Sequence, residues 1–115
     1  MLTPQNLARL KRARDQNMGE VQRLMGQGRY LEAEEYLKPL LDDWRKEGGP
    51  REDEYQMISQ LGKCLEGQRK YVEAYELYMK ALNYLTGAAY DDIYSQFLYL
   101  NEKMGAFDRK PQCGL

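Results

Sequence analysis

The feature that most constrains this chain is a short segment that occurs twice. Residues 25–33 read MGQGRYLEA and residues 66–74 read EGQRKYVEA, so glycine, glutamine, tyrosine, glutamate and alanine coincide at a constant offset of 41 residues. The match continues beyond the segment, since Glu35 corresponds to Glu76. Self-similarity at a fixed period of this size is the signature of a repeat architecture, in which neighbouring units bury one another's apolar faces.

Each copy of the segment combines a turn with the start of a helix. The shared glycine, Gly26 or Gly67, predicts a tight reversal between two helices. The shared alanine, Ala33 or Ala74, leaves room for a neighbouring helix to approach closely. The sequence therefore predicts a unit made of a helix, a short turn and a second helix.

Glycine and proline divide the whole chain into segments of helical length, and β-branched residues are scarce. Thr3 is an acceptable N-cap, and Pro4 suits the first helical position because it lacks an N–H. We expect Pro39 to kink a helix and Pro50 to open one with an acidic first turn. The predicted helices cover residues 4–25, 29–47, 50–66, 70–85 and 91–104.

The second unit carries a longer pattern of small, aliphatic and aromatic residues. The pattern is Ile58-x2-Leu61-Gly62-x2-Leu65, then Tyr71, Ala74-x3-Tyr78 and Ala81-Leu82. It resembles a tetratricopeptide repeat, although that family has aromatic residues where Ile58 and Leu65 stand and a proline near Thr86. The offset of 41 exceeds the usual repeat of about 34 residues and resembles the longer repeats of kinesin light chain-like arrays. The resemblance covers about two and a half units and implies a right-handed α-solenoid of antiparallel helix pairs with about five helices.

The composition argues against several classes of function. Lysine and arginine number 17 against 18 acidic residues, for a net charge of -1, so we expect no nucleic-acid partner. No apolar run approaches the roughly 20 residues that cross a bilayer, so we expect a cytoplasmic protein without membrane insertion. The chain has no histidine and only two cysteines. We find no constellation able to do chemistry and predict no enzyme, no catalytic residue, no metal site and no cofactor.

The resemblance also implies a binding surface, because the first helix of each pair in a tetratricopeptide array lines a concave groove. Met18 and Gln22 stand where co-chaperone members carry the lysine and asparagine that clamp a carboxylate, so we disfavour a heat-shock chaperone adaptor. The alternative is that the residues on this face are ordinary solvated side chains. The last helix offers Ser95, Leu98 and Glu102 to the same groove. The predicted groove residues are Asp15, Met18, Gln22, Met25, Gln56, Ser59, Lys63 and Glu66.

The last predicted helix is apolar nearly all round, whereas the outer face of a terminal repeat is normally polar. We therefore expect either the tail or another chain to cover it. The predicted division is a repeat domain over residues 1–104 and a flexible tail over residues 105–115. The predicted oligomer interface consists of Tyr94, Phe97, Leu98 and Leu100.

Two functions remain open from the sequence. The first is a protein–protein interaction module (an adaptor, an assembly factor or a small chaperone) that binds a peptide or helix of a partner in the groove. The alternative is a self-assembling structural subunit that forms homo-oligomers through its apolar C-terminal helix. A catalytic role or a regulatory domain of an enzyme is a third hypothesis. We disfavour catalysis, because nothing here pairs a nucleophile with a base.

Overall fold

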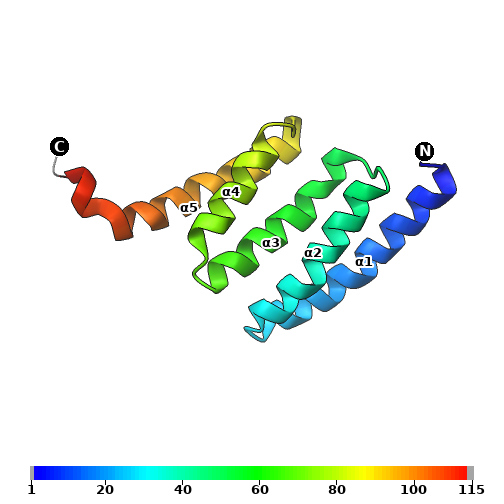
Figure 1. The fold of residues 1–115 in the computed structure, drawn as a ribbon, viewed down its shortest axis with the longest axis horizontal. Helices are drawn as coiled ribbons and strands as arrows, with labels where there is room; N and C mark the ends of the chain where they lie inside the picture. The colour runs from blue at the N-terminus through cyan, green and yellow to red at the C-terminus, as the bar shows by residue number, and fades with distance from the viewer. Residues whose placement is uncertain (1, 114–115) are drawn as a thin grey trace.

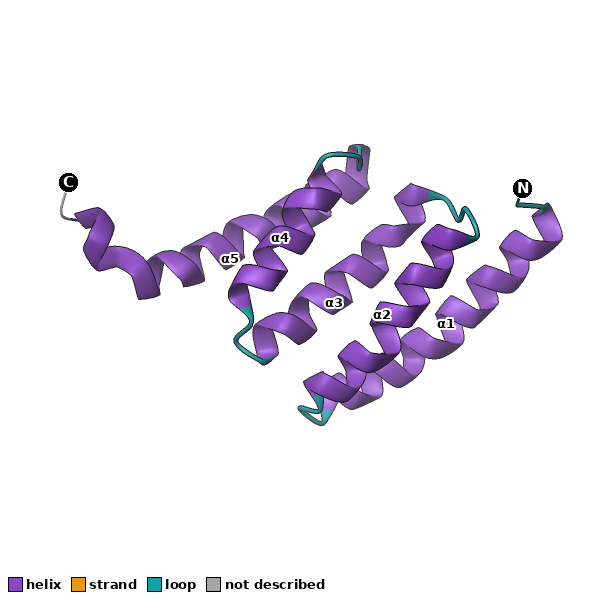
Figure 2. Cartoon of the chain, viewed as in Figure 1, coloured by secondary structure: helices purple, strands orange, loops and turns teal. Residues whose placement is uncertain are grey.

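The computed structural model describes the backbone of residues 2–113 and the side chains of residues 2–105. Within that part of the chain there are helices and connecting turns and no strand (Figure 2). The predicted all-α class with about five helices is therefore confirmed. The α-helices are α1 (Pro4–Gly26), α2 (Tyr30–Lys46), α3 (Tyr55–Gly67), α4 (Tyr71–Leu82) and α5 (Gly87–Cys113), and a 3-10 turn, η1 (Arg51–Glu54), precedes α3.

Local signals account for the first two helices. Helix α1 begins at Pro4, and the Thr3 hydroxyl accepts a hydrogen bond of 3.1 Å from the Asn6 backbone N–H, which satisfies a donor that no helical carbonyl can reach. Helix α2 continues through Pro39 to Lys46, so the proline does not end it, as predicted. The kink expected at Pro39 stays a prediction.

The turn of the repeat recurs with the same geometry 41 residues later. Gly28 and Arg69 hold equivalent positions, and both adopt left-handed backbone with φ of 76° and 63°. In each turn the next residue's N–H reaches back to a carbonyl of the preceding helix, which caps the last turn of that helix. These bonds are Arg29 N to Leu24 O at 2.9 Å and Lys70 N to Leu65 O at 2.8 Å.

This geometry corrects the role predicted for the shared glycine. Gly26 and Gly67 are the last helical residues, and the reversal takes place two residues later. A Cβ at Gly67 would lie 2.6 Å from the ring of Tyr30, whereas a Cβ at Gly26 would meet nothing. Gly67 is therefore required for the contact between the two units, and not for the turn.

The later boundaries differ from the prediction. Pro50 opens the 3-10 turn η1 rather than an α-helix, with a bond of 3.2 Å from Asp53 N to Pro50 O. Helix α4 ends at Leu82, three residues early, and α5 begins at Gly87, four residues early. Helix α5 also continues to Cys113, so the segment predicted as a tail is helical that far. The separation of a flexible tail from the repeat domain stays a prediction.

Each helix packs beside the next one in chain order, and α3 also contacts α5 (Figure 1). The result is an elongated body with extents of 56 × 32 × 20 Å. Helix α3 forms its centre, because Met57, Ile58 and Cys64 have no exposed surface. The other fully or almost fully buried large side chains are Val21, Leu37, Trp44, Glu54, Tyr78, Ile93 and Leu100.

Candidate functional site

Helices α1, α3 and α5 line two neighbouring cavities of about 550 and 360 Å³, which share Lys63 and Gln96, and Tyr30 at the start of α2 also lines the second. We call this surface the odd-helix groove. Every residue of the predicted groove set lies in it. Asp15, Met18, Gln22, Gln56, Ser59 and Lys63 line the first cavity, and Met25, Lys63 and Glu66 line the second.

The contribution of α5 to this groove differs from the prediction. Ser95, Leu98 and Glu102 do not line either cavity, and the Ser95 hydroxyl instead bonds to the Asp91 carbonyl of its own helix at 3.0 Å. The α5 residues in the groove are Asp92, Gln96, Tyr99 and Lys103. Their spacing is helical, so they form one stripe along the face of α5.

The repeat offset does not explain the error. Ser95 and Glu102 lie 36 residues after the groove residues Ser59 and Glu66 of α3, and Asp92 and Tyr99 lie 36 residues after the groove residues Gln56 and Lys63. The offset is therefore the same for both sets, and α5 presents only one strip of the equivalent face to the cavities. A polar stripe at helical spacing in α5 was the signal that could have revealed this strip.

A hydrogen-bonded network joins α3, α4 and α5 beneath the groove. Tyr78, on α4, donates to Glu66 at 3.1 Å, and its hydroxyl lies 3.3 Å from the side-chain oxygen of Gln96. Ser59 also donates to Gln96 at 3.0 Å, and Lys103 forms an ion pair of 3.0 Å with Glu66. The Glu66 and Ser59 side chains therefore already have partners within the chain.

The protonation states in this network are set by burial and by Glu66. Burial, reinforced by the Glu66 carboxylate, raises the pKa of Tyr78 well above its usual range, so the phenol stays protonated and remains a donor. The hydrogen bond to Glu66 raises the pKa of Lys103 despite its partial burial, so the ammonium stays charged. The network therefore supports the groove through fixed hydrogen bonds and is not a chain for proton transfer.

Charge is distributed unevenly along the groove. The first cavity contains the carboxylates Asp15 and Asp92, whereas the second contains Lys103 paired with Glu66. Lys63 lines both cavities, and no ion pair of its ammonium occurs among the described side chains. The groove therefore has an acidic end and an end whose charges form an ion pair, with one cation available between them.

The predicted oligomer interface is only partly accessible. Leu100 has no exposed surface and lies in the core of its own chain, so it is not available to a second copy. Phe97 packs against Tyr75 with ring centroids 5.1 Å apart. Tyr94 and Leu98 are 41% and 45% exposed. The outer face of α5 therefore offers Tyr94 and Leu98 but not the whole predicted set.

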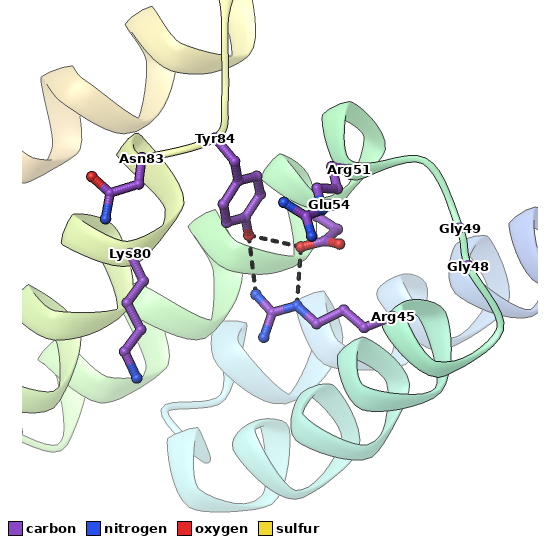
Figure 3. A pocket seen from close by; sticks show the side chains of 8 residues that line it. All are labelled: Arg45, Gly48, Gly49, Arg51, Glu54, Lys80, Asn83 and Tyr84. Atoms are coloured by element: carbon purple, nitrogen blue, oxygen red, sulfur yellow. Dashed lines mark hydrogen bonds and ion pairs between the residues drawn. The ribbon is translucent and has the colours of Figure 1, made fainter.

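A third cavity, of about 670 Å³, lies at the C-terminal ends of α2 and α4 (Figure 3). Arg45, Glu54 and Tyr84 meet there in a triangle of hydrogen bonds: Arg45 to Glu54 at 3.1 Å, Arg45 to Tyr84 at 3.1 Å and Tyr84 to Glu54 at 2.8 Å. Sequence reasoning missed this cavity, because its residues come from two stretches, 45–54 and 80–84, that lie far apart in the sequence. Only the run Gly48-Gly49-Pro50, which predicts a loop, pointed to the place.

Burial and these bonds act on the pKa values in the triangle. Burial lowers the pKa of Arg45, but its hydrogen bonds to Tyr84 and Glu54 outweigh burial and the net change is upward. Burial and the Glu54 carboxylate raise the pKa of Tyr84. Arg45 therefore stays charged and Tyr84 stays neutral under ordinary conditions.

Two features bear on possible chemistry among the described residues: the state of the buried cysteine and the grouping of metal-ligating side chains. Cys64 is buried, and burial raises its pKa to about 11, so its thiol has the character of an inert core cysteine. Cys113 lies outside the residues whose side chains are described. No group of three or more histidine, cysteine, aspartate or glutamate side chains among the described residues could hold a metal ion.

Comparison with known proteins gives no relative. No family model, no curated protein and no solved structure matches this chain. Within the described part of the chain, no helix is both long enough and apolar enough to cross a membrane.

Proposed function

We propose that the chain is a right-handed, tetratricopeptide-like solenoid of antiparallel helix pairs and that it acts as a cytoplasmic protein–protein interaction module. The observation that carries the proposal is the alignment of three polar stripes, on α1, α3 and α5, along one groove. Rigid helices that present such stripes hold several weak contacts in place before the partner arrives, so less entropy is lost on binding. An adaptor, an assembly factor or a small chaperone would use the groove in this way.

The expected partner is a peptide or helix with charges of both signs. A basic residue of the partner would lie near Asp15 and Asp92, and an acidic residue would lie near Lys63. Met18 and Met25, which line the two cavities, supply adaptable apolar contacts between these charges. Glu66 contributes less than the sequence predicted, because Tyr78 and Lys103 already occupy its carboxylate.

The test is a selection of random peptides by display against the wild-type chain, followed by anisotropy measurements on the best binder. Lys63→Glu reverses the unpaired cation of the groove and should weaken binding about tenfold or more. The matched control is Lys46→Glu, which makes the same change at an exposed position on α2 outside the groove. Equal affinity for Lys63→Glu and Lys46→Glu would contradict the proposed site.

Self-assembly through α5 is the second candidate, and the exposure of Tyr94 and Leu98 favours it. Light scattering behind size exclusion should compare the wild type with a Tyr94→Asp, Leu98→Asp variant. A wild-type oligomer that this variant converts into a folded monomer would support an interface on α5. Substitution of Phe97 or Leu100 is unsuitable for the test, because both side chains pack within the chain.

A further inference from the structure

We propose that the third cavity, between the C-terminal ends of α2 and α4, binds a small molecule that carries a phosphate monoester. We call it the Arg51 cavity. It shares no residue with the odd-helix groove, so the proposal is independent of the proposed function. Three observations carry it: an excess of positive charge, a rigid frame and a volume suited to a small molecule.

The charge of the cavity is unbalanced. Its lining contains three cations, Arg45, Arg51 and Lys80, and a single carboxylate, Glu54. Arg45 and Glu54 form an ion pair, which leaves the charges of Arg51 and Lys80 without a counter-ion in the lining. Two unmatched positive charges complement a phosphate monoester, which carries about −1.5 to −2 charges at neutral pH.

Arg51 is held by a neighbour that does not neutralise its charge, and Arg45 keeps a free donor beside its ion pair. The guanidinium of Arg51 lies over the ring of Tyr84, 5.1 Å from the centroid, and no carboxylate pairs with it among the described residues. Arg45 uses Nε and one terminal nitrogen for Glu54 and Tyr84. Its other terminal nitrogen remains available as a donor. Guanidinium groups with donors to spare are the usual means of binding phosphate oxygens.

The loop that carries Arg51 is fixed from below by Trp44. The indole N–H of Trp44 donates to the Pro50 carbonyl at 2.9 Å, and the Gly49 N–H donates to the Trp44 carbonyl at 2.8 Å. A Cβ at Gly49 would lie 2.4 Å from the indole, so the backbone of the loop rests directly on the ring. This pre-organisation means that binding a ligand need not order the loop.

The volume decides between the phosphate group alone and a larger ligand. The cavity measures about 670 Å³, within the range of roughly 300–1,000 Å³ typical of small-molecule sites. A phosphate ion would occupy only part of that space. Asn83, which Figure 3 places beside Lys80 on the α4 side, supplies an amide that can recognise a hydroxyl of the remainder.

The test is an NMR titration of the full chain that follows the indole N–H of Trp44, the only tryptophan. The probes are inorganic phosphate, ribose 5-phosphate, unphosphorylated ribose and a phosphoserine peptide. We expect saturable shifts with both phosphate compounds, tighter binding of ribose 5-phosphate than of phosphate, and no shift with ribose. Arg51→Gln and Lys80→Gln should each weaken ribose 5-phosphate about tenfold, because each removes a charge-assisted hydrogen bond.

The control variant is Arg12→Gln, which removes an exposed positive charge on α1 outside the cavity and should leave the affinity unchanged. Arg51 and Lys80 are also exposed, so the backbone spectrum of each variant should remain that of the folded wild type. Absence of saturable binding, or equal affinity in Arg51→Gln, Lys80→Gln and Arg12→Gln, would overturn the proposal. Tighter binding of the phosphoserine peptide than of ribose 5-phosphate would overturn it in favour of a phosphorylated protein partner.

Discussion

The hairpin of α1 and α2 and the hairpin of α3 and α4 turn in the same way but fill the same buried positions with different side chains. In the second hairpin Gly62 faces Tyr78, and a Cβ at Gly62 would lie 2.1 Å from the phenol oxygen. The positions 41 residues earlier hold Val21 and Leu37, and both are fully buried. The position of Gly62 thus holds the larger valine in the first hairpin, and the position of Tyr78 holds the smaller leucine.

This difference indicates what the repeat preserves. The backbone geometry of the turns is nearly the same. The side-chain volume of the buried pair is shared by both helices in the first hairpin, whereas in the second hairpin the second helix supplies almost all of it. Close packing explains this, because a core tolerates exchange of side chains when the total volume is kept. The units differ in polarity as well, since the phenol of Tyr78 binds Glu66 and Gln96 beneath the groove and Leu37 has no hydroxyl.

The largest effect is expected when the second hairpin receives only one of the two buried residues that the first hairpin has at the equivalent positions. Gly62→Val should destabilise the chain by about 3 kcal/mol, because its side chain overlaps the ring of Tyr78. Adding Tyr78→Leu recreates the pair Val21 and Leu37 and should recover a substantial part of that loss. Urea unfolding followed by circular dichroism measures both values.

A double-mutant cycle tests whether the two buried pairs are equivalent. A favourable coupling between Gly62→Val and Tyr78→Leu is expected because the two substitutions share one contact. Purely additive losses would show that the two pairs are not equivalent. The control is Gly19→Ala, also inside a helix, where a Cβ meets nothing and a gain of up to about 1 kcal/mol is expected from helix propensity.

The contacts that follow each hairpin differ in chemistry as well. Glu34 of α2, only 4% exposed, accepts hydrogen bonds from Gln68 at 2.7 Å and Lys70 at 3.4 Å in the second unit. Its equivalent in α4 is Tyr75, which packs against Phe97 of α5. One junction is therefore polar and sensitive to protonation, whereas the other is aromatic.

The second prediction uses this difference in protonation. Burial raises the pKa of Glu34, but hydrogen bonds from Lys38 and Gln68 outweigh it, so the folded-state pKa is lowered. A lowered pKa contributes stability above the unfolded-state pKa, and that contribution is lost as pH falls through the folded-state value. Glu34→Gln should therefore cost about 1–2 kcal/mol near neutral pH and progressively less in acid.

Urea unfolding at about pH 7 and about pH 3 measures this change. The control is Glu35→Gln, which removes the next carboxylate at an exposed position and should change stability by less than about 0.5 kcal/mol. If Glu34→Gln costs the same at both pH values, the carboxylate charge is not what stabilises the polar junction.

The sequence predicted the first two helices and the first hairpin well, because their signals are local. Thr3, Pro4 and the turn after Gly26 act through neighbouring backbone groups, so they are legible without the fold. The groove positions of α1 and α3 were predicted from the resemblance to a tetratricopeptide array, and these residues line the two cavities. The position of the turning residue was wrong, since an arginine in left-handed backbone at Arg69 gives no signal in the sequence.

The stripe of α5 and the Arg51 cavity depend on distances that no local pattern encodes. The stripe depends on which side of α5 packs against α3 and α4 and which side is left to line the groove. The end of α4 is set by the turn at Asn83 and Tyr84 rather than by glycine or proline. The cavity is lined by Arg45, Arg51 and Lys80, which belong to α2, η1 and α4. Composition shows that these cations exist but not that they line one cavity.

The smallest expected effect tests whether the two turns are interchangeable. Gly28 adopts its left-handed φ without steric cost, whereas Arg69 carries a Cβ that disfavours it. Gly28→Arg should therefore destabilise the chain by about 1 kcal/mol, and Arg69→Gly should stabilise it by up to a similar amount. The same urea experiment measures both, and the doubly exchanged variant should return close to the wild type because the turns lie in different hairpins. If Gly28→Arg left the free energy of unfolding unchanged, arginine would adopt the left-handed backbone here without strain. The glycine of the first turn would then be required for a reason other than backbone conformation.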